Sequence, residues 1–189
     1  PVLVLAFANN HTEENQKLTA LRREHNEIKA ILEQAERDGL CELKVLPFAT
    51  SDEVIAILQD QNIRDRIALF HFSGHASSYK LMLEAEHGAA QEVDGKAFAH
   101  FLRHAKGLKL VFLNACSTEA QVKAMQDTYQ IPLVIGTTER VKDDIARRIS
   151  VAFFKGLAQG LSFEDALADA EQTIFKDHPP SENYRGIVI

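Results

Sequence analysis

Cysteine is scarce in this chain of 189 residues, which contains only Cys41 and Cys116. Two cysteines are too few for a disulfide framework, and such low cysteine usage is typical of proteins from a reducing compartment. We therefore expect a cytoplasmic protein that folds without covalent cross-links. A chain of this length can bury enough apolar surface to do so.

Long apolar runs are absent as well. No stretch approaches the roughly 20 apolar residues that a membrane-spanning helix needs, so no membrane partner is expected. The apolar segment 2–8 is predicted to be a strand rather than the core of a signal peptide, because no basic residues precede it. The chain begins at Pro1 rather than at Met, which we interpret as a sign that it was excised from a longer, multidomain protein.

Positive charge is also in short supply. Lysine and arginine total 21 against 27 aspartate and glutamate residues, a formal net charge of −6, and no basic cluster is interleaved with aromatic residues as nucleic-acid binding requires. Neither a G-x-G-x-x-G segment nor a Walker sequence occurs, so a phosphate-binding loop is missing. Nucleic acid is thus not expected as a direct partner, and no cofactor is expected.

What the chain does contain is a regular alternation of apolar runs with segments of helical periodicity. Nearly continuous apolar runs are typical of parallel strands buried on both faces. With right-handed crossovers, this order predicts one α/β domain over residues 1–189, a three-layer sandwich whose mostly parallel sheet has helices on both faces. We expect strands at residues 2–8, 41–48 and 133–135, in the apolar parts of 66–76 and 108–118, and at the edge in 187–189.

Three of the predicted helices begin with capping residues. Thr50 and Glu53 have the spacing of a capping box, while Asp94 and Ser162 can each cap a further helix. Other helices are expected for about twenty residues after the polar segment 9–14, from Glu119 to Tyr129, and from about Ile145 to Leu157. The acidic residues of the first long helix, Glu24, Glu27, Glu33 and Glu36, are interpreted as a solvated face. Alternating residues at 79–84 predict a strand or hairpin arm at the sheet margin.

Cys116 is the first candidate functional residue. It follows the apolar run LKLVFLN, and the small and polar residues around it allow a sharp turn before the helix predicted from Glu119. A thiolate is stabilised at such a place, since backbone N–H groups at a helix N-terminus are unpaired and the helix dipole favours negative charge. The position therefore indicates a reactive cysteine.

His75 follows a second apolar run of the same kind, RIALFHFSGHA at residues 66–76. In open α/β sheets, functional groups gather beyond the carboxyl ends of the strands. If the two strands are parallel neighbours, His75 and Cys116 reach one crevice together. A cysteine with a histidine is the minimum set for nucleophilic attack on an acyl carbon.

These two motifs resemble the CHAT domain, a branch of the caspase and separase type of cysteine peptidases. The resemblance extends through residues 131–137, Asp143 with Ala146, and the segment FFKGLAQGLSFEDALADAE, so that it covers about residues 66–175. It implies a cysteine endopeptidase that acts on protein substrates, as an effector coupled to a sensor or scaffold domain in a bacterial conflict, cell-death or defence system. The alternative from a different class is a CHAT-fold interaction module without turnover.

The resemblance also implies roles for individual residues. Cys116 would attack the scissile carbonyl and His75 would protonate the leaving amine, while the backbone N–H groups of Cys116 and Ala76 would hold the oxyanion. The family commonly has glycine where this chain has Ala76, which would be strained if the loop needed a positive φ. No third member of a triad is evident, and the nearby Asn114 and Ser73 are interpreted as turn-forming residues.

Two neighbouring carboxylates, Asp143 and Asp144, are expected to bind a basic substrate residue before the scissile bond. Asp143 matches the acidic position of the family, and a carboxylate pairs well with Lys or Arg. Their alternative role is in the first turn of the following helix, where acidic residues suit the dipole.

Metal binding is the other chemistry that we considered. Two pairs of histidines have the spacing H-x-x-x-H, namely His71 with His75 and His100 with His104. The first pair lies on a strand and loop rather than on a helix, and the second lacks the adjacent glutamate and third ligand of a zinc hydrolase. We therefore expect no metal site.

Overall fold

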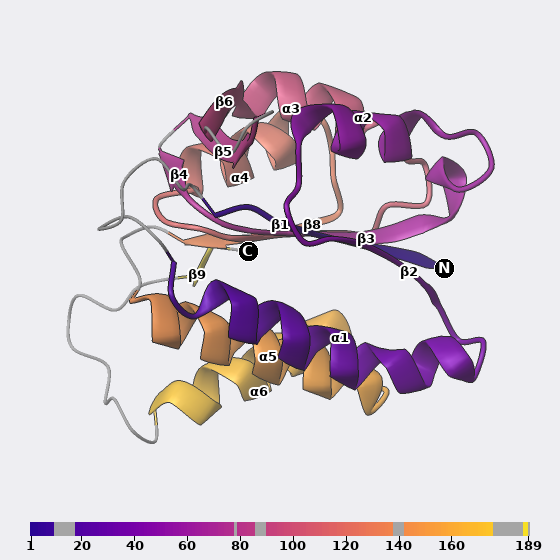
Figure 1. The fold of residues 1–189 in the computed structure, drawn as a ribbon, viewed down its shortest axis with the longest axis vertical. Coiled ribbons are helices and arrows are strands. Elements are labelled where there is room, and N and C mark those ends of the chain that lie inside the picture. Colours follow the sequence, from indigo (N-terminus) through magenta and orange to yellow (C-terminus); the bar gives the residue numbers. More distant parts are fainter. Residues whose placement is uncertain (10–17, 78, 86–89, 138–141, 176–186, 189) are drawn as a thin grey trace.

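A six-stranded sheet runs through the centre of the protein (Figure 1), with the strand order β2-β1-β3-β7-β8-β9. The structure, a computed structural model, describes residues 1–9, 18–77, 79–85, 90–137, 142–175 and 187–188. All strand pairs are parallel except the last, in which β9 runs antiparallel to β8. The strands are β1 (Val2–Phe7), β2 (Glu42–Leu46), β3 (Ile67–Ser73), β7 (Leu110–Asn114), β8 (Leu133–Thr137) and β9 (Ile187–Val188).

Helices cover both faces of this sheet, which confirms the predicted three-layer α/β sandwich. Figure 1 shows α1 (Leu21–Arg37), α5 (Asp143–Ala158) and α6 (Phe163–Phe175) on one face, and α2 (Ser51–Gln59), α3 (Gly95–Leu102) and α4 (Glu119–Asp127) on the other. A short 3-10 turn, Arg64–Arg66, precedes β3. No described helix has both the length and the apolar character needed to cross a membrane.

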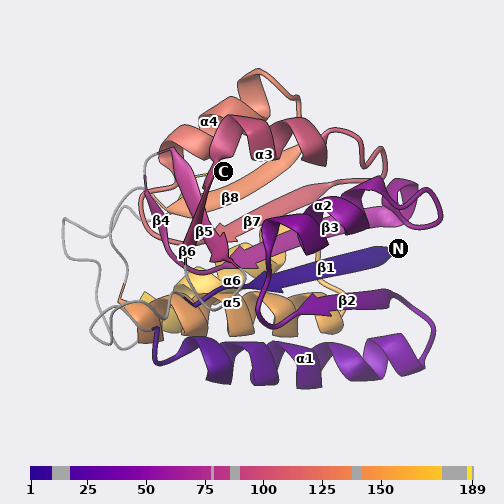
Figure 2. The ribbon, with the colours of Figure 1, turned by 45° about the horizontal axis from the view of Figure 1, so that its top comes forward.

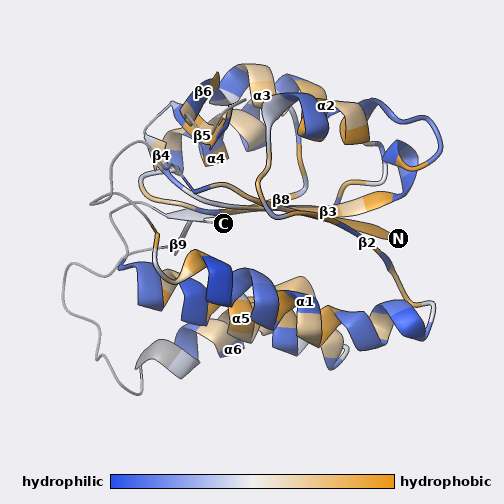
Figure 3. Ribbon diagram, in the orientation of Figure 1, coloured by the Kyte–Doolittle hydropathy of each residue, from blue (hydrophilic) through white to orange (hydrophobic). Residues whose placement is uncertain are grey.

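Each face of the sheet has its own apolar core. Phe70 and Phe72 of β3 pack with the α2, α3 and α4 layer, whereas Leu69 of the same strand packs with α1, α5 and α6. Successive side chains of a strand point to opposite faces, so burial on both sides requires the continuous apolar runs seen in the sequence. The strands and the inner faces of the helices are correspondingly apolar, and the outer helix faces are hydrophilic (Figure 3).

A second, smaller sheet follows His75, where the sequence predicted a strand or hairpin arm at the margin of the main sheet. The alternating segment forms an antiparallel sheet of its own with its neighbours, β4 (Ala76–Ser77), β5 (Lys80–Glu84) and β6 (Ala90–Asp94). Figure 2 shows it beside α3 and α4 rather than in line with the central strands. The prediction of a strand or hairpin arm is thus confirmed, but the hairpin belongs to a separate sheet and not to the margin of the main one.

All three predicted caps are present. The Thr50 and Glu53 capping box is formed in both directions, Asp94 accepts hydrogen bonds from two backbone N–H groups of α3, and Ser162 Oγ accepts from Asp165 N at 3.1 Å. Boundaries differ by a few residues, since β2 is shorter than predicted and α4 ends at Asp127. Of the expected last strand, Ile189 lies outside the described residues.

The prediction that the acidic residues of α1 form a solvated face is wrong at one position. Glu24 is only 2% exposed, whereas Glu27, Glu33 and Glu36 are half-buried or exposed. The reason lies in the helical period: Glu24 follows Leu21 by three residues and precedes Ile28 by four, so it falls on the apolar stripe that faces the sheet.

Candidate active site

The turn that carries Cys116 begins at the carboxyl end of β7 and ends at the first residue of α4. The structure therefore places Cys116 between a strand end and a helix N-terminus, as the sequence predicted, and its side chain is half-buried. Ser117, the next residue, has a φ of 55°, in the left-handed region that residues with a side chain rarely adopt. The backbone thus reverses sharply just after the thiol.

Strand β8 holds this turn in place through Thr137. The backbone N–H of Thr118 donates to the carbonyl oxygen of Thr137 at 2.8 Å, and the N–H of Thr137 donates to Oγ1 of Thr118, also at 2.8 Å. The hydroxyl of Thr137 donates to the carbonyl oxygen of Ala115. Gly136 permits this approach, because a Cβ there would lie 2.5 Å from Oγ1 of Thr118.

His75 lies in the short loop between β3 and β4. The preceding Gly74 passes close to β1, and a Cβ at that position would lie 2.7 Å from the carbonyl oxygen of Ala8. On the other side, the carbonyl oxygen of His75 accepts from Met82 N at 3.0 Å, and Gln121 Nε2 of α4 donates to the carbonyl oxygen of Ser77 at 2.6 Å. The His75 loop is therefore tied both to the small sheet and to the helix after Cys116.

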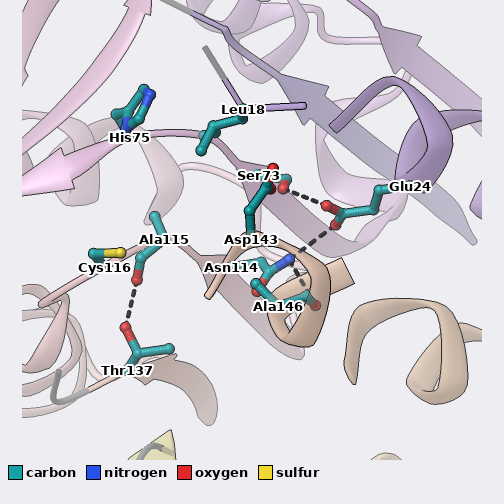
Figure 4. Close-up of a pocket in the computed structure, with 11 residues that line it drawn as sticks. Leu18, Glu24, Ser73, His75, Asn114, Ala115, Cys116, Thr137, Asp143 and Ala146 are labelled. Carbon is teal, nitrogen blue, oxygen red and sulfur yellow. Dashed lines mark hydrogen bonds between the residues drawn. The ribbon is translucent and has the colours of Figure 1, made fainter. Parts of the chain in front are cut away.

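The pairing of β3 with β7 brings the two candidates together. In this parallel ladder Ser73 is the register partner of Asn114, so both strands end at the same level. His75 and Cys116 each follow two residues later and line one pocket of about 40 Å³. Figure 4 shows them on the same side of this pocket.

Glu24 lines the same pocket from the opposite side (Figure 4), and it is the site residue that the sequence interpretation missed. Its carboxylate accepts hydrogen bonds from Ser73 Oγ at 2.9 Å, Asn114 Nδ2 at 2.9 Å and Ser150 Oγ at 2.7 Å. Ser73 and Asn114 thus have a buried polar partner beyond the turn-forming role expected for them. The signal in the sequence was an acidic residue on an apolar helix stripe.

Ala76, the predicted second oxyanion donor, has an ordinary backbone conformation. Ala76 is the first residue of β4, and it is not among the described non-glycine residues with a positive φ, which are Ser117 and Gln130. The strain considered for an alanine at this position is therefore absent.

Asp143 and Asp144 occupy the first turn of α5, but only Asp143 is among the residues that line the described pocket. Its Oδ2 accepts from Ala20 N at 2.7 Å and from Thr19 Oγ1 at 3.3 Å, and so caps α1 from another helix. Asp144 pairs with Arg147 at 2.9 Å, and this hydrogen bond holds the pKa of Asp144 below its usual value.

The two histidine pairs considered as metal ligands lie in different environments. His71 is completely buried among the rings of Phe7, Phe112 and Phe154, and its Nε2 lies 3.4 Å from Oε1 of Glu24 without forming a hydrogen bond. The rings of His100 and His104 stack edge to face, with centroids 5.6 Å apart. Among the residues that the structure describes, no three His, Cys, Asp or Glu side chains are grouped closely enough to hold a metal ion.

Comparison with known families accounts for this arrangement. The family described as the CHAT domain matches residues 1–187, nearly the whole chain and more than the 66–175 of the sequence resemblance. The chain belongs to the CHAT domain family. No match to this CHAT domain is found among curated protein sequences.

Three solved structures with a similar fold are a caspase and two other cysteine proteases. The initiator caspase Dronc of Drosophila superposes with a TM-score of 0.60 at 9% identity, covering 98% of this chain and 76% of its own. A secreted C11 cysteine protease from Bacteroides thetaiotaomicron gives 0.63 at 10% identity, covering 93% and 58%. The Arg-specific cysteine proteinase gingipain R gives 0.58 at 15% identity, covering 94% and 42%.

These likenesses show that the CHAT domain has the caspase-like peptidase fold. Identities of 9–15% are too low to carry over more than the fold. The chain also spans little more than half of the C11 protease and less than half of gingipain R.

The left-handed backbone of Ser117 leads to a first testable prediction. We expect Ser117→Gly to leave the stability unchanged or raise it by up to about 1 kcal/mol, because glycine adopts a positive φ without a Cβ clash but loses more entropy on folding. Urea denaturation measures the change. Ser117→Ala is the control and should not stabilise the protein. A clear loss of stability in Ser117→Gly would contradict the claim that the backbone is strained at this position.

Proposed function

We propose that this CHAT domain is a cysteine endopeptidase in which Cys116 is the nucleophile and His75 the acid and base. The observation that carries the proposal is that both residues line one pocket at the carboxyl ends of two neighbouring parallel strands. Such a crevice is the usual place for function in an α/β sheet. The caspase-like fold of cysteine proteases supports the same reading.

The chemistry follows from these two side chains. Sγ of Cys116, as a thiolate, attacks the carbonyl carbon of the scissile peptide, and its electron pair forms the C–S bond. The tetrahedral intermediate collapses with cleavage of the C–N bond, and His75 as imidazolium gives its proton to the leaving amine. Water, deprotonated by His75, then hydrolyses the thioester and restores the thiolate.

The negative oxygen of the intermediate needs backbone donors. We assign this role to the N–H group of Cys116, in the turn after β7, and to that of Ala76, which follows the His75 loop as the first residue of β4. The hydrogen bonds of Thr137 to residues 115 and 118 hold the first turn, while the β4–β5 ladder holds the second. An oxyanion hole of this kind is preorganised by elements far apart in the sequence.

The pocket is too small for a substrate side chain as it stands. About 40 Å³ holds about three waters, since each needs roughly 10–15 Å³ of such volume. We therefore propose a latent enzyme, opened by a sensor or scaffold domain, that acts as an effector on protein substrates in a bacterial conflict, cell-death or defence system. Its loops after β4 and β8 include residues 78 and 138–141, which lie outside the described residues.

The small volume of the pocket also favours the second candidate function, an interaction module that keeps the fold without turnover. The two candidates differ in one property, the reactivity of Cys116 toward a peptide. A thiol-alkylating peptide probe should label Cys116 quickly and selectively if the domain is a peptidase, and no faster than an ordinary thiol if it is a module.

Substitution of the two residues tests the peptidase. We expect Cys116→Ala to lower turnover of a cleaved protein by about a thousandfold or more, and His75→Ala by about a hundredfold or more, with the fold unchanged by circular dichroism. Cys41→Ser is the matched control and should retain full turnover. Burial, with the nearby Glu36, raises the pKa of the Cys41 thiol, so little of it is thiolate at neutral pH. Wild-type turnover in Cys116→Ala would refute the mechanism.

Latency has its own test. Leu18 forms one wall of the pocket, so Leu18→Ala should enlarge it and raise the labelling rate of Cys116 in the isolated domain severalfold. Leu40→Ala is the control, because this leucine is 66% exposed. Saturable turnover by the isolated wild-type domain, equal to that of the full-length protein with its activating partner, would rule latency out.

Substrate preference depends on Asp143, the acidic group that lines the pocket. We propose that it binds Lys or Arg before the cut, because a carboxylate pairs well with a basic side chain and offers Arg a bidentate partner. Its contact with Ala20 N makes Asp143→Asn the suitable variant, since the amide oxygen can still cap α1 while the charge is lost.

In peptide-library profiling of activated protein, Asp143→Asn should lower the preference for basic residues by about tenfold or more, because a hydrogen bond to a charged group contributes about 1.5–3 kcal/mol. Asp144→Asn should have a smaller effect, since Arg147 already neutralises this second carboxylate. A wild-type preference for acidic or apolar residues, unaltered by Asp143→Asn, would contradict the assignment.

A further inference from the structure

Glu24 is a buried ionisable residue, 2% exposed, that lines the pocket across from His75 and Cys116, and the mechanism above does not use it. A carboxylate is costly to bury unless hydrogen bonds replace its water. Glu24 has three such bonds, all from side chains buried to at least 95%. An acid kept in such a place at this cost needs an explanation.

The two carboxylate oxygens are divided between the two strands that carry the site. Oε2 accepts from Ser73 Oγ at the end of β3, and Oε1 accepts from Asn114 Nδ2 at the end of β7, each at 2.9 Å. Ser73 and Asn114 are register partners in the ladder. Glu24 therefore bridges the last rung that joins β3 and β7.

Each bridged residue lies two positions before a residue of the proposed catalytic pair: Ser73 before His75, and Asn114 before Cys116. Beyond this rung the chains separate into two turns. We infer that Glu24 is a positioning residue, which sets the spacing and orientation of His75 and Cys116 through Ser73 and Asn114. This inference rests on the proposed peptidase function.

The acceptor has to serve several donors at once. Oε1 also accepts from Ser150 Oγ of α5 at 2.7 Å, and Asn114 Nδ2 donates in addition to the carbonyl oxygen of Ala146 at 3.2 Å. A carboxylate accepts at both oxygens without presenting a donor of its own. Glutamine can partly replace it, because its amide can donate to the Ser73 hydroxyl while its oxygen accepts from Asn114.

Two serines with the same chemistry supply a matched pair of variants. Ser73→Ala and Ser150→Ala each remove one hydroxyl donor to Glu24, but only Ser73 lies on a strand that leads to the catalytic pair. Both should lower the melting temperature. Only Ser73→Ala should disturb the reactivity of Cys116.

The experiment uses the full chain in a Cys41→Ser background, so that Cys116 is the remaining thiol. The rate of alkylation by iodoacetamide, a reagent too small to need a substrate groove, is measured against pH for each variant, with His75→Ala as the reference for a broken pair. We expect the profiles of Glu24→Ala and Ser73→Ala to move toward that of His75→Ala, Glu24→Gln to move less, and Ser150→Ala to match the wild type.

Turnover of a cleaved peptide gives the second readout. Glu24→Ala should lower kcat by about tenfold to a hundredfold with little change in KM, the effect of a small misplacement of reacting groups. If Glu24→Ala does not fold, Ser73→Ala against Ser150→Ala decides the question alone.

Two negative results are distinguishable. In the first, the wild-type profile differs from that of His75→Ala, but Glu24→Ala retains the wild-type profile and kcat. Glu24 is then structural, and the inference fails while the peptidase stands. Where Glu24→Ala does not fold, the same result for Ser73→Ala leads to the same conclusion. If wild type and His75→Ala have the same profile, the catalytic pair itself is refuted, and the inference with it.

Discussion

The parallel pairing of β3 with β7 is the constraint on which the candidate site depends. Ser73 lies opposite Asn114, so two segments about forty positions apart in the chain end at one level of the sheet. A slip of one residue would exchange the two faces of a strand, and it would send Phe70 and Phe72 into the wrong layer. The apolar cores on both sides therefore enforce the register that aligns the two turns.

Around this register, the remaining elements restrain the turns rather than supply chemistry. Thr137 of β8 binds the backbone of Ala115 and Thr118, on the two sides of Cys116, and Gln121 of α4 binds the strand that follows His75. Gly74 and Gly136 allow the close backbone approaches that these contacts need. The pocket of about 40 Å³ is bordered by the two turns that these contacts restrain.

The fold persists at 9–15% identity to caspases and related proteases because it depends on the pattern of residue types more than on their identity. Continuous apolar strands, capped helices and small residues at the turns can each be met by many sequences. The proposed chemistry is less tolerant, since it would need a thiol and an imidazole at two particular turns. For that reason the similarity to cysteine proteases shows the fold of this CHAT domain, whereas its activity stays a proposal.

The sequence by itself determined the order of strands and helices, the caps at Thr50, Asp94 and Ser162, and the placement of Cys116 and His75 beyond strand ends. These features are encoded in short windows, where period, capping residues and turn residues act locally. Tertiary structure decided the rest: the separate β4–β5–β6 sheet, the burial of Glu24 between two strands, and the contact of Asp143 with the start of α1. The small sheet pairs locally, but its place beside α3 and α4 depends on how the layers pack. The contacts of Glu24 and Asp143 join residues 49 to 126 positions apart, and their partners become neighbours only when the layers pack.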